Sequence, residues 1–442
     1  MSAVKVPEAP VRVSHPLRAE AVRGFAPFAG AAVVLTLGVL LAGSSPHWQG
    51  GWAETAAQLH NSVLISVPLA AAAGCWQGGR ERRRRTEELW GTVVRTPLAR
   101  FLASALPVAF WTAAGHLVAA GLATLATWPY AQGDRPRLGT LPGDTVAMAA
   151  AALLGHVVGR AVPTRLAAPL LAIAGYVGLG VLAYADPGLP GYLDPAFPIM
   201  DTDVPVWWQP LAMAGWTAGL ALAATLGYAA RRRTTALLPL AAAVAAATVL
   251  GQTGDGLWHE DPLARRQVCD TSITPAVCVD ARFAGMLPQI TDALSGITGR
   301  LKGVRNLPPR WEDENHESRD PEAQLPMLTP LGWSVVRGRL ADPRQYAWQA
   351  AAALERRPEC LHPTRRMLLA DDAVETYLAS SPLQDGLDAW DAKGSAKQRA
   401  ELRAHRAARA RLRAMDDEDR RAWLSAYFAT AGTCDVKGVP AL

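Results

Sequence analysis

The chain has 442 residues, a net charge of +5 and a composition in which half of the residues are hydrophobic, so one compact soluble domain does not account for it. The basic excess lies before residue 253, because residues 253–442 carry 26 Lys or Arg against 27 Asp or Glu. This distribution argues against nucleic-acid binding and indicates an apolar first part and a charged second part.

The first part begins with a polar, proline-containing segment, residues 1–24, which shows no cleavable secretory signal and is expected to be cytoplasmic. Long apolar runs rich in Ala, Leu, Gly and Val follow and predict membrane helices. These runs cover residues 25–42, 61–77, 101–127, 145–159, 166–184, 208–229 and 235–252. The predicted fold is all-α: a polytopic membrane helix bundle of about six or seven spans over residues 25–252, then a mainly helical soluble domain over residues 253–442.

The orientation follows from the charges between the apolar runs. With a cytoplasmic N-terminus and seven spans, the inner segments hold sixteen Lys or Arg, whereas the short outer loops hold only Arg135 and Arg137. Tryptophan and tyrosine residues fall at the predicted outer rims, as in an interfacial belt. They include Trp48, Trp52, Trp128, Tyr130, Trp207 and Trp208. We therefore predict a multi-pass plasma-membrane protein in contact with membrane lipids, with residues 253–442 outside the cell.

The most distinctive inner segment is Arg80–Arg100, with the sequence RERRRRTEELWGTVVRTPLAR. Thr86 is a plausible helix N-cap, the two glutamates after it favour the first turn, and Pro97 ends the helix. The apolar side chains share one helical face. They are Leu89, Trp90, Val93 and Val94. A short helix cannot bury such a face alone, so the segment predicts a partner surface.

This segment resembles the first cytoplasmic loop of type 2 ATP-binding-cassette (ABC) permeases of actinobacteria. In that loop an arginine-rich run, a Thr-Glu-Glu-Leu helix and a Thr-Pro turn form the coupling helix that docks on the ATPase subunit. The matching residues are Thr86, Glu87, Glu88, Leu89, Thr96 and Pro97, whereas Arg85 stands where glycine is expected. The alternative interpretation is an ordinary loop whose arginines only fix the topology.

The resemblance implies a permease subunit of an ABC exporter, with its coupling helix near residues 86–97. It also implies a separate ABC ATPase subunit as partner, a second permease copy or homologue, and neither a catalytic site nor a cofactor in this chain. The implied ATPase-docking residues are Thr86, Glu87, Glu88, Leu89, Trp90, Val93, Val94 and Pro97.

Four of the five cysteines lie in the second part of the chain: Cys269, Cys278, Cys360 and Cys434. An even number in an exported domain predicts two disulfides, with three possible connectivities. The short loop favours Cys269 with Cys278, which leaves Cys360 with Cys434. A four-cysteine zinc site is the alternative, but the chain has no CxxC pair.

Motifs for enzymatic chemistry are missing from the sequence. It contains no GxxxxGK[ST] loop, no HExxH and no GxSxG, so we expect neither an ATPase nor a metal-dependent or serine hydrolase. Within the apolar runs, His116 and His156 are candidates for a substrate or proton pathway, or else neutral histidines hydrogen-bonded between helices. Gly155 and Gly159 form a GxxxG motif, which is typical of close helix packing.

The soluble part reads as helices over residues 288–304, 344–357, 364–380 and 396–430, with a proline-rich and acidic linker at 306–330. The basic run Lys397–Arg413 is either a solvated helix or a surface for anionic ligands. A second functional hypothesis follows from this domain. The chain would be a non-transporting membrane protein that displays an outer sensing or assembly domain.

Overall fold

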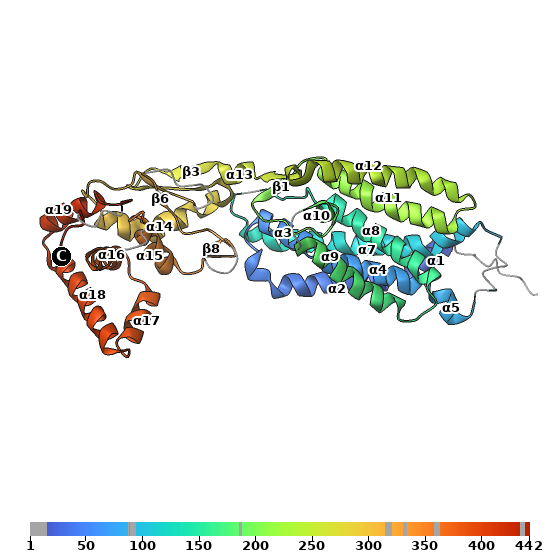
Figure 1. The fold of residues 1–442 in the computed structure, drawn as a ribbon, viewed down its shortest axis with the longest axis horizontal. Helices are drawn as coiled ribbons and strands as arrows, with labels where there is room; N and C mark the ends of the chain where they lie inside the picture. The colour runs from blue at the N-terminus through green and yellow to red at the C-terminus, as the bar shows by residue number, and fades with distance from the viewer. Residues whose placement is uncertain are drawn as a thin grey trace, which may run out of the picture. The chain divides into compact units, whose positions relative to one another are not determined.

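The computed structural model describes residues 16–86, 88, 94–133, 135–184, 188–313, 321–329, 334–357, 363–433 and 438–442. The fold is mostly helical, with 69% helix and 6% strand, and it separates into two compact units (Figure 1). The helical unit contains residues 1–44, 56–125 and 137–259. The C-terminal unit contains residues 45–55, 126–136 and 260–442. Two short segments from the first part of the chain therefore belong to the C-terminal unit.

The helical unit is built from long apolar helices. Their bounds are α1 Pro16–Arg23, α2 Ala26–Gly43, α3 Trp52–Asn61, α4 Val63–Gly78, α5 Arg80–Arg84, α7 Pro97–Thr127, α8 Leu141–Ala161, α9 Ala167–Tyr184, α10 Leu189–Tyr192, α11 Gln209–Ala229 and α12 Leu237–Thr253. Strands β1 Asp203–Pro205 and β2 Trp258–Glu260 are short. Helix α4 packs against α8 and α9, and α11 packs against α8 and α12.

Several of these helices could cross a membrane. Among the described residues, five helices are long and apolar enough: α2, α7, α8, α11 and α12. The pair α3 and α4, bent by 40°, makes a sixth if it is one broken span, and Ala167–Leu182 of α9 is a shorter apolar helix. The apolar runs of the sequence therefore do form helices, while the number of spans stays a prediction.

Glycines bring α4 and α8 into close contact. A Cβ atom added to Gly155 would lie 1.9 Å from the carbonyl oxygen of Ala71, and one on Gly159 would lie 2.0 Å from that of Cys75. The fit is reciprocal, since a Cβ on Gly74 would lie 1.9 Å from the carbonyl oxygen of Ala152. Helices that approach so closely gain backbone and dispersion contacts that do not depend on water, which is the way membrane helices associate.

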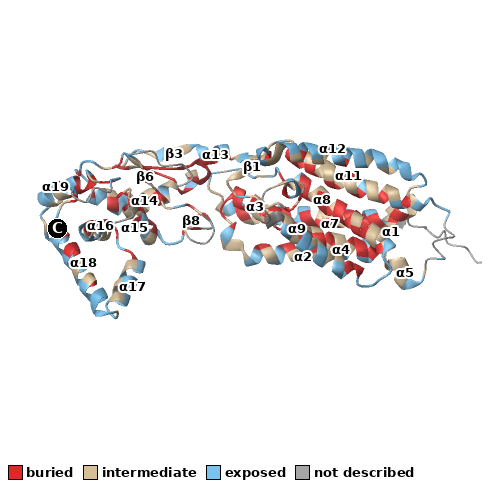
Figure 2. Ribbon diagram, viewed as in Figure 1, coloured by how far each residue is buried: buried red, intermediate tan, exposed pale blue. Residues whose placement is uncertain are grey.

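The outer surface of the helical unit is apolar. In α12, only 11% of the most apolar window is buried, although its mean hydropathy is 1.8, and Figure 2 shows this helix mostly exposed. Leu237, Leu238 and Val244 of α12 are 63%, 80% and 55% exposed. Soluble proteins rarely leave so large an apolar surface uncovered, so the helical unit requires lipid or a protein partner around it.

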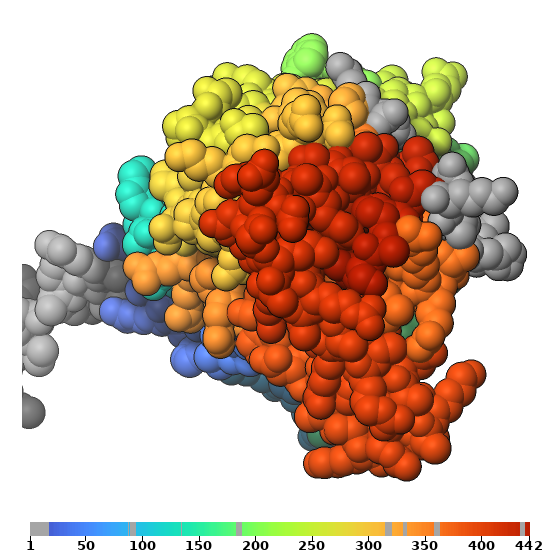
Figure 3. Space-filling model, turned by 90° about the vertical axis from the view of Figure 1, so that its left-hand side faces the viewer, coloured from blue at the N-terminus to red at the C-terminus, as the bar shows by residue number. Residues whose placement is uncertain are grey.

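The C-terminal unit combines short strands with amphipathic helices. Their bounds are α13 Pro262–Arg265, β3 Gln267–Asp270, β4 Ala276–Asp280, α14 Leu287–Arg300, β5 Arg310–Glu312, β6 Ala323–Gln324, β7 Val335–Val336, β8 Arg339–Leu340, α15 Pro343–Ala353, α16 Arg365–Leu378, α17 Pro382–Asp391, α18 Ala396–Ala414 and α19 Asp417–Phe428. Helices α17 and α18 form a hairpin that projects from the unit (Figures 1 and 3).

A four-stranded sheet in this unit differs from the mainly helical pattern that the sequence indicates. Its order is β3-β4-β5-β6, with β3 and β4 antiparallel and the other pairs parallel. Each strand has only two to five residues, too few for a clear alternation of apolar and polar positions. Two of these strands, β5 and β6, lie within the predicted linker 306–330. The predicted helix 396–430 is also divided, because Asp416 caps a new helix, α19.

The predicted disulfide between Cys269 and Cys278 is confirmed. The two residues are direct partners across β3 and β4, with their Cα atoms 4.0 Å apart. Cys360 and Cys434 lie outside the described residues, so their pairing stays a prediction. Cys75 is a buried free cysteine in α4.

A buried ion pair ties one of the two short segments to the C-terminal unit. Arg282 donates to Glu54 at 2.6 Å, and the two side chains are 2% and 5% exposed. Trp48 and Trp52 in the same segment are also buried, 3% and 6% exposed. These two tryptophans pack inside the unit, so they do not form the interfacial belt that the sequence predicts, whereas Trp128 is 67% exposed.

Candidate functional site

The arginine-rich run begins as a helix of its own, α5, separated from α4 by Gly79 alone and located at one end of the helical unit (Figure 1). Helix α5 ends at Arg84, and Arg85, the residue after it, has a φ of 55° and a ψ of 37°, in the left-handed region. Glycine adopts this conformation most readily and commonly follows a helix C-terminus. It is also the residue that the resemblance to ABC permeases leads us to expect at this position.

Helix α5 is fastened to the end of α8 by reciprocal contacts. Arg160 donates to Glu81 at 3.0 Å. In return Arg82 donates to the carbonyl oxygens of Arg160 and Val162, both at 2.9 Å. The arginine thereby satisfies carbonyl groups that have no partner within their own helix at its C-terminus.

A second set of contacts joins α5 to α1 and α4. Glu20 in α1 accepts hydrogen bonds from Arg80 and from Gln77 of α4, both at 2.6 Å. Gln77 is only 3% exposed, so part of this polar cluster is shielded from solvent. Helix α5 is therefore connected to the ends of three other helices, α1, α4 and α8.

The predicted docking residues follow α5 directly. Thr86 donates from its side chain to the carbonyl oxygen of Glu81 at 3.4 Å, and Glu88 is exposed. Val94 is fully exposed, at 100%. Four of the other five predicted residues, Glu87, Leu89, Trp90 and Val93, lie outside the described residues. Most of the helix that we predict from them lies there too, although Glu88 is helical.

The segment ends at the start of α7. Pro97 is the first residue of α7, a position where its missing N–H costs nothing. The side chain of Thr96 accepts a hydrogen bond from the backbone N–H of Ala99 at 3.2 Å and so caps this helix. The Thr-Pro pair thus starts a 31-residue helix. Residues 85–96 connect α5 to α7 along the chain.

The two histidines proposed for a pathway are both buried but have different surroundings. His156 in α8 has its Nε2 atom 3.1 Å from the hydroxyl of Ser104, and its ring packs edge-on against Phe101 with the centroids 4.7 Å apart. His116 in α7 has no hydrogen-bond partner in the described part of the chain. No hydrogen bond or ring contact joins the two histidines across the described residues. His156 fits the helix-packing alternative.

A third histidine, which sequence reasoning did not single out, forms a buried polar cluster. His60 lies 2.8 Å from Asp144 and 3.0 Å from the carbonyl oxygen of Phe197. Both partners are acceptors, so a doubly protonated ring satisfies both. Asp194 lies beside a cavity of about 20 Å³, room for about one water, and burial raises its pKa to about 6. The sequence signal for this cluster was Asp144, an aspartate that directly precedes the apolar run 145–159.

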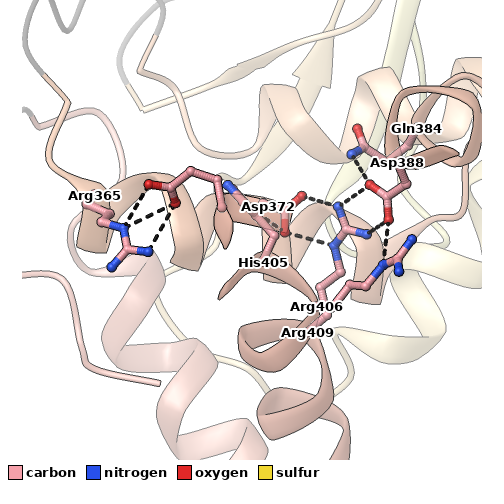
Figure 4. A network of polar contacts seen from close by, with 8 residues as sticks. Arg365, Asp372, Gln384, Asp388, His405, Arg406 and Arg409 are labelled. Carbon is pink, nitrogen blue, oxygen red and sulfur yellow. Dashed lines mark hydrogen bonds and ion pairs between the residues drawn. The ribbon is translucent and has the colours of Figure 1, made fainter. Parts of the chain in front are cut away.

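The C-terminal unit contains a charge network on its helical hairpin (Figure 4). Arg409 of α18 bridges Asp372 of α16, at 2.6 and 2.8 Å, and Asp388 of α17, at 2.7 and 3.2 Å. His405 lies 3.0 Å from Asp372. Arg409, which belongs to the basic run 397–413, therefore forms ion pairs with carboxylates of the same unit. In the described part of the chain, no group of three or more His, Cys, Asp or Glu could hold a metal ion.

Comparison with known proteins leaves the function to be argued from this geometry. No family model, no curated protein and no solved structure matches the chain. The arginine-rich end of the helical unit is the candidate site, because α5 is joined there to α1, α4 and α8.

Proposed function

We propose that this chain is the membrane-spanning permease subunit of an ABC exporter and that a separate ATPase docks on residues 86–97. The observation that carries the proposal is the attachment of α5 to α1, α4 and α8, close in sequence to the exposed residues Glu88 and Val94 that precede α7. In such an arrangement, a partner that moves this segment also moves the ends of four helices.

The second support is the uncovered apolar surface of the helical unit. Helices α2, α11 and α12 have 33%, 22% and 11% of their most apolar windows buried. Lipid and a second permease copy or homologue would cover these faces. In this proposal the N-terminus is cytoplasmic and the C-terminal unit is outside the cell, which agrees with the positive charges around α5 and with the disulfide Cys269–Cys278.

The test is a pull-down of the tagged full-length protein from native membranes in mild detergent. The wild type is expected to co-purify with an ATPase in near-equal amount. The double variant L89D/W90D should insert into the membrane normally but lose at least about 90% of the ATPase, since two carboxylates in an apolar contact cost more than one tenfold step in affinity.

The matched control is L383D/W390D, which introduces the same charges on α17. Leu383 and Trp390 are 55% and 72% exposed, so the unit tolerates this change. This control should keep the ATPase at the wild-type level. Association that survives L89D/W90D would overturn the docking proposal.

A second candidate function is supported by a groove in the C-terminal unit. The groove has a volume of about 1090 Å³ and is lined by apolar and polar side chains, including Met327, Tyr346, Gln349 and Leu383. A cavity of this size could hold a ligand, as an outer sensing domain requires. This function predicts a monodisperse protein that co-purifies without any ATPase, so the same pull-down distinguishes the two proposals.

A further inference from the structure

A pocket of about 390 Å³ lies beside the arginine-rich end of the helical unit. It is formed by the end of α1, the start of α2, the end of α4 and α5. Arginine and aromatic side chains line it together: Arg23, Phe28, Trp76, Arg80, Arg83 and Arg84. Thr86, Glu88 and residues 94–97, the described part of the predicted docking segment, do not line this pocket.

The charge of the pocket is strongly unbalanced. Four arginines line it, and Glu20 pairs with only one of them, Arg80. The Arg83 guanidinium lies over the Trp76 ring, 4.0 Å from its centroid, and Arg23 and Arg84 are exposed, with no ion pair in the described part of the chain. Burial and, to a smaller extent, repulsion from Arg165, Arg84 and Arg80 lower the pKa of Arg83. An anion in the pocket would relieve this repulsion.

An apolar stripe continues from the pocket along α2. Phe28, Leu35 and Val39 are 72%, 69% and 65% exposed, and their spacing of seven and four residues places them on one helical face. The pocket and the stripe together offer an anion site joined to a long apolar track. This combination matches a molecule with a phosphate headgroup and a hydrocarbon chain.

A second copy of the chain fits this surface less well. In a two-fold dimer across this face, the same surface patch meets itself, so the arginines of the two pockets would face each other. Such juxtaposition of like charges is costly. A free phosphate ion would leave the apolar stripe unexplained.

We infer that this pocket binds the headgroup of an anionic phospholipid, with Arg23 and Arg84 at the phosphate and the acyl chains along Phe28, Leu35 and Val39. Trp76 and Arg83, which also line the pocket, would lie between the bound phosphate and the acyl chains. The bound lipid would bridge α1, α2 and α5 and so stabilise the end of the helical unit on which the proposed docking segment is mounted.

The experiment measures lipid retention by the full-length protein. The purified protein is incubated in detergent with equal amounts of phosphatidylglycerol and phosphatidylcholine, and native mass spectrometry counts the bound lipids. The wild type should retain phosphatidylglycerol preferentially. R23Q/R84Q should bind it about 30-fold more weakly, because each arginine near a lipid headgroup contributes roughly a factor of five.

The matched control is R231Q/R233Q, which removes two exposed arginines from the connection between α11 and α12. It should retain phosphatidylglycerol like the wild type. The proposal is wrong if R23Q/R84Q also binds like the wild type, or if both double variants lose the lipid equally, since the latter indicates general surface charge. Displacement of the lipid by millimolar inorganic phosphate would identify a free-phosphate site and also overturn it.

Discussion

The two units of this protein differ in packing and in the residues that they expose. In the helical unit, glycines bring α4 and α8 into close contact, and large apolar side chains such as Phe28, Leu35 and Leu238 are exposed. The C-terminal unit buries Trp311 and Tyr427 completely, at 0% exposure. Its charged residues form the surface or pair with each other, as Arg409 does.

This difference is what we expect if the helical unit lies in lipid and the C-terminal unit in water. In water, the burial of large apolar side chains is the main source of stability. In lipid, that driving force is lost, and close backbone contact between small residues takes its place. On this two-solvent account, the exposed leucines of α12 and the buried tryptophan of β5 follow from the same physics applied in two media.

The largest expected effect comes from the glycine contact in the helical unit. Substituting Gly155 with leucine places a side chain where even a Cβ would be 1.9 Å from the Ala71 carbonyl oxygen, so α4 and α8 must separate. We expect a loss of about 4 kcal/mol or more and little folded protein. The measurement is the monodisperse fraction and Tm in detergent.

The control for this change is G121L in α7, because an added Cβ there meets no atom within 4 Å. G121L should keep a Tm within a few degrees of the wild type, since surface substitutions usually have small effects. Equal Tm values for G155L and the wild type would show that the helical unit is not held by this close packing.

A medium effect is expected from the buried pair in the C-terminal unit. E54Q removes the carboxylate charge that accepts from Arg282 at 2.6 Å, and breaking such a buried ion pair typically costs about 3 to 5 kcal/mol. The double variant E54Q/R282M should recover part of this loss, because the buried arginine charge is then removed as well. A double-mutant cycle by thermal unfolding measures the coupling, and additive effects would contradict it.

The smallest expected effect is a pH-dependent change in stability that comes from Glu375. Burial and repulsion from Asp372 and Asp371 raise its pKa from 4.5 to about 7, so the folded protein holds this proton more tightly than the unfolded chain does. Stability is therefore lost as the pH rises from about 4.5 to about 7. E375Q should be more stable than the wild type by about 1 to 3 kcal/mol at pH 8 and equal to it at pH 4.

For Asp372 we expect the opposite dependence of stability on pH. Burial disfavours its ionisation, but hydrogen bonds from His405 and Arg409 outweigh this and lower its pKa. D372N should therefore lose stability most at neutral pH and least at acid pH. Tm values from pH 4 to pH 8 test both variants, and parallel pH profiles for the two would refute the assignment.

The sequence predicted those features that a local pattern encodes. Apolar runs gave the long helices of the helical unit, and the GxxxG of Gly155 and Gly159 marked a close contact. The short cysteine loop gave the pair Cys269–Cys278. The predicted partner helix after Thr86 falls mostly outside the described residues and stays a prediction, as does the pairing of Cys360 with Cys434.

Contacts between distant residues could not be predicted in this way. Glu54 and Arg282 are 228 residues apart, and no local sequence pattern around either residue predicts the contact with the other. The same holds for His60 with Asp144. The strands β5 and β6 are too short to show alternation, and they are stable only because the sheet and the core behind them provide partners.

The most direct test of the two-solvent account is the accessibility of single cysteines in intact cells. Trp390 in the C-terminal unit and Arg232 between α11 and α12 are both exposed, and labelling of the wild-type chain, which keeps its own five cysteines, sets the background. A membrane-impermeant maleimide should label W390C in intact cells and R232C only after permeabilisation. Labelling of both in intact cells, or of R232C alone, would contradict the account.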